Sequence, residues 1–160
     1  MRAMIVSVGA LLLAAALLHF GNGMSYTLTS VRLAGDGVSA SLQGLVGSFY
    51  FAGFFVGPIV ALRAIRLVGH IRSFCVFAAI LSVGVLSMAL VGDPFAWAGS
   101  RFCMGLSLVG LFTVTESWLN ERADTDNRGQ LLASYFVIVY ASQSGGALVA
   151  VEMSPWTFQP

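Results

Sequence analysis

The sequence predicts an all-α integral membrane protein with five transmembrane helices. Hydrophobic residues make up 58% of the 160 positions and charged residues only 9%, whereas soluble domains carry about 25% charged residues. The net charge of +1 also lacks the clustered positive charge that binding to a phosphate backbone requires. These proportions exclude an ordinary cytosolic enzyme, a disordered regulator and a nucleic-acid-binding protein.

Stretches without charged residues locate the five spans, because a bilayer core of about 30 Å needs about 20 apolar residues in a helix. No Asp, Glu, Lys or Arg occurs in residues 3–31, 37–62, 73–92 and 129–151. Residues 94–119 contain only Arg101 and Glu116, and charged side chains toward the ends of a span can reach the interface. The predicted spans are residues 4–28, 40–62, 73–92, 95–118 and 129–151.

The first span could be mistaken for a cleaved signal peptide, because Arg2 precedes it and residues 14–16 are alanines. Its apolar run continues to Phe20, which is too long for a signal-peptide core of about 7–15 residues. We therefore expect the span to be retained. Its polar side chains recur at intervals of three or four residues, on one side of a helix, at His19, Asn22, Ser25 and Tyr26. Such a stripe can line a solute path or form hydrogen bonds between helices, and the spacing favours neither.

Short local signals support the later spans. Gly53 and Gly57 form a small-xxx-small pair, which lets a neighbouring helix approach the backbone of the second span. Asp93 followed by proline predicts an N-cap for the fourth span. Asn127, with Gln130 three residues later, predicts a capping box at the start of the fifth.

The arginine distribution predicts the orientation, since all eight basic residues are Arg. Arg101 falls within a span, and only Arg32 falls on the side opposite the N-terminus. The other six share the side of the N-terminus: Arg2, Arg63, Arg66, Arg72, Arg122 and Arg128. By the positive-inside rule, the N-terminus is cytoplasmic and the tail at residues 152–160 lies outside.

Two segments resemble the major facilitator superfamily of transporters. The basic turn between the second and third spans, residues 57–72, is similar to the superfamily's signature between helices two and three, with Gly69 at its second glycine. Leu62 stands where the signature's first glycine is expected, and Arg66 where an aspartate usually stands. Basic inner turns also arise simply from the positive-inside rule, so this turn alone is weak support for the resemblance.

The second segment carries the resemblance more strongly. Arg101 and Gly105 match the Arg-x-x-x-Gly pattern of helix four, and residues 116–120 read Glu-Ser-Trp-Leu-Asn. Together with residues 127–135 and Tyr140, this order is similar to helices four and five of the YcaD-like branch of the superfamily. The Gly-Pro-rich helix-five signature of the superfamily's antiporters has no counterpart, so antiport receives no support.

The resemblance implies twelve helices in two six-helix halves, with a solute held between the halves and exposed alternately to each side. Five spans correspond to most of the N-terminal half, and the second half is absent. We therefore expect the chain to be a fragment or a truncated product, with the missing helices supplied by the rest of a longer protein or by a partner chain. The resemblance also implies a bacterial cytoplasmic membrane.

Arg101 is the leading candidate for the solute path, because a charge at the centre of a span costs about 2.5–3.5 kcal/mol on insertion scales and usually faces a cavity or a partner. Its guanidinium would contact an anionic group of the solute or a carboxylate on another helix. Snorkelling toward the outer face is the alternative. The candidate pathway residues are Asn22, Tyr26, Arg101 and Thr115.

Glu116 is the only acidic residue within a predicted span. It lies 15 residues beyond Arg101, or roughly 22 Å along a helix, so the two side chains cannot pair. We expect Glu116 to pair with Arg66 or Arg72 as a charge latch at the inner gate, and His70 to be solvated. The candidate gate residues are Gly57, Arg66, Gly69, Arg72, Glu116 and Arg128.

The predicted function is transport of an unidentified small solute by alternating access, as part of a permease. The alternative is a small membrane protein that binds or scaffolds other membrane subunits and moves nothing. An enzyme is not expected, because the sequence contains no His-Glu-x-x-His motif, Gly-x-Ser-x-Gly elbow, phosphate loop or paired carboxylate cluster. No metal or cofactor is predicted, and the expected partners are the solute, the lipid bilayer and the missing half.

Overall fold

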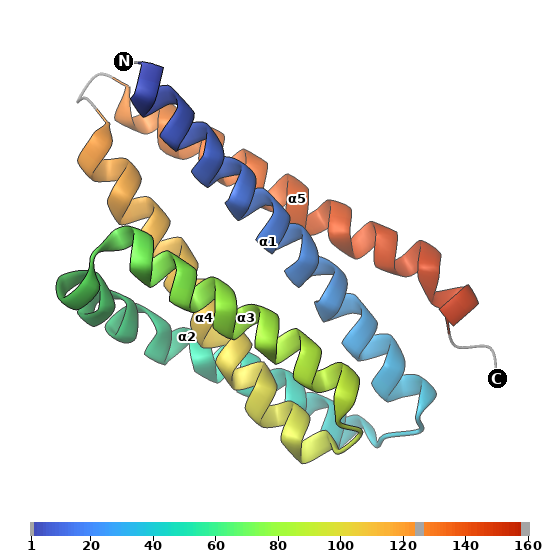
Figure 1. Cartoon of the computed structure of the whole chain (residues 1–160). Coiled ribbons are helices and arrows are strands. Elements are labelled where there is room, and N and C mark those ends of the chain that lie inside the picture. The colour runs from blue at the N-terminus through green and yellow to red at the C-terminus, as the bar shows by residue number, and fades with distance from the viewer. Residues whose placement is uncertain (1, 124–126, 158–160) are drawn as a thin grey trace. The chain divides into compact units, whose positions relative to one another are not determined.

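The computed structural model describes residues 2–123 and 127–157, and within these residues it contains five α-helices and no strand (Figure 1). Each helix is long and apolar enough to cross a membrane. This confirms the predicted all-α class with five candidate spans. The helices are α1 (Arg2–Gly35), α2 (Ala40–Val68), α3 (His70–Leu90), α4 (Pro94–Arg122) and α5 (Arg128–Thr157).

All five helices extend past the predicted spans at one end or both, as α5 does from residue 151 to Thr157, and α3 alone also ends before its predicted limit, at Leu90 instead of residue 92. The reason is that charge-free stretches mark the part of a helix suited to hydrocarbon, whereas the helix itself ends where the backbone can turn. Gly37 and Gly69, which have φ angles of 67° and 81°, lie just beyond the ends of α1 and α2 in the left-handed region that favours glycine. The positions of the spans in a bilayer remain predictions.

The chain divides into two compact units. The first contains α1, α5 and the last residues of α4 from Leu119, and the second contains α2, α3 and α4 as far as Trp118.

In the first unit, α1 and α5 lie side by side (Figure 1) and pack closely through glycines. A Cβ atom on Gly23 would collide with the backbone carbonyl of Gln143, and one on Gly146 with the carbonyl of Phe20. The two backbones therefore touch at this crossing, which only residues without a side chain permit.

In the second unit, α2 packs against α4 through the two glycines that the sequence singles out. A Cβ on Gly53 would meet the backbone of Phe102 and Leu106, and one on Gly57 would lie 2.8 Å from the Leu106 carbonyl oxygen. On the opposite side of the contact, Gly105 of α4 lies against the Tyr50 carbonyl. The predicted close approach at Gly53 and Gly57 is confirmed, and its partner is α4.

The helix α3 runs antiparallel to α4 in a regular register. Ser87 and Ser100 share a hydrogen bond of 2.8 Å near one end of the pair. Farther along, Gly84 meets the side chain of Met104, and Gly110 of α4 meets the ring of Phe77. Each step back along α3 is thus matched by a similar step forward along α4, as in an antiparallel helix pair with an apolar seam.

The start of α4 has the predicted cap. The Asp93 carboxylate accepts a hydrogen bond of 2.9 Å from the backbone N–H of Ala96, and Pro94 occupies the first helical position, where no N–H partner is needed. The Trp97 indole N–H also donates to the Val91 carbonyl and ties the α3–α4 turn to the new helix.

Replacing Asp93 with alanine should lower the free energy of unfolding by about 1 kcal/mol, because the Ala96 N–H loses its acceptor. Asp93→Asn should stay close to the parent, since asparagine caps equally well. The measurement is unfolding in mixed detergent micelles, followed by circular dichroism. Equal losses for both variants would show that the carboxylate charge, rather than the cap, supplies the stability.

The capping box predicted at α5 is wrong. The Leu131 N–H donates to the Asn127 backbone carbonyl at 3.0 Å, but neither side-chain hydrogen bond of a capping box forms between Asn127 and Gln130, both within the described part of the chain. These two amides line a cavity instead.

Candidate functional site

Arg101 is buried, with 2% of its surface exposed, although it lies on a helix suited to span a membrane. Its guanidinium carbon lies 4.5 Å from the centre of the Tyr50 ring, in the geometry of a cation–π interaction. The close α2–α4 packing at Gly105 holds Tyr50 in this position. This placement favours an interior role for Arg101 over snorkelling along the surface.

Two hydroxyl groups of α4 are buried as well. Thr115 is 1% exposed and Ser107 is fully buried, and neither hydroxyl has a hydrogen-bond partner within the described residues. At 100° per residue, Thr115 lies on nearly the same face of α4 as Arg101, whereas Ser107 lies on a different face. The three residues therefore do not form one polar track. Ser107 was not predicted, because a single serine in an apolar stretch gives no pattern.

The polar stripe of α1 lies in the other unit. His19 and Asn22 are buried, at 1% and 2% exposure, whereas Tyr26 is 38% exposed. A side-chain hydrogen bond joins His19 to Gln143 of α5. This contact supports the interhelix reading for His19, and the solute-path reading of the stripe stays a prediction. Gln143 was not singled out, because the polar residues of the fifth span follow no single face in the sequence.

Of the predicted gate residues, Arg66, Gly69 and Arg72 lie at the α2–α3 turn, which is a single residue long, whereas Arg128 begins α5 in the other unit. Gly69, with φ 81° and ψ 172°, both ends α2 and precedes α3. Arg66 and Arg72 are exposed and Glu116 is half-buried, and no ion pair joins either arginine to Glu116, all three being described residues. The charge latch stays a prediction. Gly57 packs against α4 rather than lying in the turn.

His70 differs from its predicted solvated state. It is half-buried at the start of α3, and its Nε2 atom lies 3.0 Å from the Ser117 hydroxyl of α4. Between the end of α4 and the start of α5, the Arg128 Nε–H donates to the Asn120 side-chain carbonyl. Two residues of the 116–120 segment thus hydrogen-bond to residues at the starts of α3 and α5.

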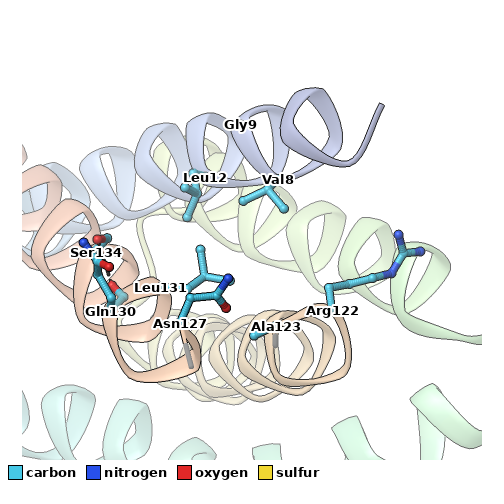
Figure 2. Close-up of a pocket in the computed structure, with 9 residues that line it drawn as sticks. All are labelled: Val8, Gly9, Leu12, Arg122, Ala123, Asn127, Gln130, Leu131 and Ser134. Carbon is cyan, nitrogen blue, oxygen red and sulfur yellow. Dashed lines mark hydrogen bonds between the residues drawn. The ribbon is translucent and has the colours of Figure 1, made fainter. Parts of the chain in front are cut away.

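A cavity of about 460 Å³ lies in the first unit, between the start of α1, the end of α4 and the start of α5 (Figure 2). Its walls are largely apolar, with amides from Asn127 and Gln130, and the Arg122 side chain extends away from the other lining residues (Figure 2). The lining residues are Val8, Gly9, Leu12, Arg122, Ala123, Asn127, Gln130, Leu131 and Ser134. None of the predicted pathway or gate residues lines it.

Comparison with known proteins supplies the biological context. The family model described as "Sugar (and other) transporter" matches residues 5–155. An uncharacterized MFS-type transporter of Yersinia enterocolitica is 31% identical over 123 residues, covering 77% of this chain and 32% of the relative. The uncharacterized MFS-type transporter YcaD of Escherichia coli is 30% identical over 128 residues, covering 80% and 34%.

The chain therefore spans about a third of the length of the curated relatives that it matches. No solved structure matches it.

Proposed function

The chain belongs to the major facilitator superfamily, within its sugar (and other) transporter family, and from this membership we propose that it forms the first five helices of a permease that moves a small solute by alternating access. The family match over residues 5–155 carries the proposal. It is supported by the five apolar helices and by the short coverage of the relatives, which leaves room for the second half of such a protein. A similarity to transporters does not favour the alternative, a scaffold that moves nothing.

We assign Arg101 to the solute path. A buried guanidinium in a membrane span is costly and usually serves a pathway or a partner. The guanidinium is stacked on the Tyr50 ring, and the planar fork of N–H donors that a guanidinium carries suits a carboxylate or phosphate group of a solute. The proposed orientation places the N-terminus in the cytoplasm of a bacterial cell, from the arginine distribution.

The first test is the size and activity of the native product, expressed from its own locus with an N-terminal tag. If the chain is part of a permease, the molecular mass of the product should be well above the 16.9 kDa of these 160 residues. The purified product, reconstituted into lipid vesicles, should then take up at least one radiolabelled solute from a panel of sugars, organic acids and phosphorylated compounds. Vesicles containing heat-denatured protein are the control.

A stable 16.9 kDa product that purifies without other membrane subunits and moves none of these solutes would contradict the proposal. A product of that size which purifies with a second multi-span chain would place the missing helices on the partner, and the pair would then be tested for uptake.

A further inference from the structure

The contact between His70 and Ser117 continues the register of the α3–α4 pair. Phe77 packs on Gly110, and seven residues back along α3 from Phe77 is His70, whereas seven residues forward along α4 from Gly110 is Ser117. The hydrogen bond of 3.0 Å therefore falls where the antiparallel seam places the two residues face to face. It is not a chance contact between mobile surface side chains.

The same pair of helices has a hydrogen bond at its other end. Ser87 of α3 and Ser100 of α4 share a bond of 2.8 Å, and the contacts of Gly84 with Met104 and of Phe77 with Gly110 lie between the two ends. One end contact joins an imidazole to a hydroxyl group and the other joins two hydroxyl groups, and neither contains a carboxylate. A seam of this kind is fixed in register by its polar ends, because a shift of one turn would leave both hydroxyl groups facing apolar side chains.

The backbone around His70 is built to hold the imidazole in place. Gly69 has a φ of 81°, a conformation that allows α3 to begin immediately after α2. The Gly69 carbonyl then accepts hydrogen bonds from the Ser73 hydroxyl at 2.8 Å and the Ser73 N–H at 3.2 Å. Ser73 is fully buried, so the first turn of α3 is ordered and presents His70 to α4.

Within residues 2–123 and 127–157, the arginines of the same turn make no comparable contact. Arg66 and Arg72 are exposed, and the neighbours Leu67 and Ile71 are 83% and 71% exposed. Exposed ion pairs contribute about 0–1 kcal/mol even where they form. The side chain that links this turn to α4 is thus a histidine rather than an arginine.

We propose that the hydrogen bond between His70 and Ser117 holds the start of α3 against the end of α4, and we call this contact the fastener. It makes His70 a positioning residue of the transport cycle. This inference rests on the proposed function, since a rocking mechanism needs helices that move as one body. The fastener keeps the α2–α3 turn attached to α4 while the unit tilts. The expected solute does not contact His70.

The test is hydrogen–deuterium exchange of the full-length protein in lipid nanodiscs. His70→Ala and Ser117→Ala should each speed amide exchange in the peptide covering residues 66–76 by about 2- to 10-fold, as expected for the loss of one hydrogen bond. The double variant should show the same increase as either single variant, because all three lack the same bond. His70→Gln should restore slow exchange, since its amide nitrogen reaches the position of the imidazole Nε2 atom.

Ser87→Ala is the matched control. It removes the hydrogen bond at the other end of the same seam, so it should speed exchange around residues 84–91 and leave residues 66–76 unchanged. Arg72→Gln alters the charge of the inner turn without removing the bond, and should exchange like the parent.

Additive effects of His70→Ala and Ser117→Ala, or no effect of Ser117→Ala, would overturn the fastener. So would fast exchange in Arg72→Gln, which would return the role to the charged residues. If His70→Ala does not fold, Ser117→Ala and His70→Gln still decide the question. Exchange does not depend on transport: a protein that shows these changes but moves no solute contradicts the proposed function alone, and one that transports without them contradicts the fastener alone.

Discussion

Replacing Gly105 with alanine is expected to force α2 away from α4 and to lower the free energy of unfolding by about 3 kcal/mol, the upper part of the range for overpacked sites. The added Cβ would overlap the backbone carbonyl oxygen of Tyr50. This oxygen belongs to the main chain of α2, so it cannot rotate away as a side chain would. The helix must shift as a whole, and the contacts at Gly53 and Gly57 are lost with it.

Two other glycines provide controls for this experiment. A Cβ on Gly99, on the same helix, would meet nothing within 4 Å, so Gly99→Ala should be neutral or slightly stabilising. A Cβ on Gly84 would lie 2.5 Å from the Cγ atom of Met104, a flexible side chain that can move, so Gly84→Ala should fall between the two. Unfolding in mixed detergent micelles gives the order directly. A Gly105→Ala variant as stable as Gly99→Ala would contradict the described α2–α4 packing.

The helices were predictable because one physical requirement, about 20 apolar residues without charge, decides where a chain can cross a bilayer. The partners of the helices were not. Gly53 and Gly57 indicate that some backbone comes close, but a missing side chain carries no information about which helix that is. The contact of Gly146 with Phe20 was not predicted for the same reason, because a glycine in the fifth span does not indicate which helix lies against it.

The candidate site was also predictable only in part. A lone arginine in an apolar span predicts its own interior placement, since lipid exposure is costly, and Arg101 is indeed buried. Its aromatic neighbour was not predictable, because Tyr50 stands among several aromatic residues that read equally well as lipid-facing. His70 was misjudged because charge counting treats the inner turn as one basic surface. A hydrogen bond between polar side chains 47 residues apart depends on the helix register, which the sequence does not state.

Removing the charge of Arg101 in the full-length protein is expected to reduce the initial rate of solute uptake by about 10- to 100-fold, the equivalent of one charge-assisted hydrogen bond. Arg101→Gln should show the full loss. Arg101→Lys retains the charge but not the planar fork that stacks on Tyr50, so it should recover only part of the rate. The measurement is uptake of the solute found in the vesicle screen, at concentrations below and above saturation.

The Tyr50 variants decide how Arg101 acts. Tyr50→Phe keeps the ring under the guanidinium and should transport like the parent, whereas Tyr50→Leu removes a cation–π contact of about 1 kcal/mol and should raise the half-saturating concentration by roughly 5-fold. Thermal unfolding of each variant separates loss of binding from loss of folding. If Arg101→Gln folds and transports an anionic solute at the parental rate, Arg101 is not in the path and its burial serves packing alone. If Tyr50→Leu instead matches Arg101→Gln, the ring is needed to place the charge, because an arginine that has lost its stacking partner can swing away from the solute while keeping its charge.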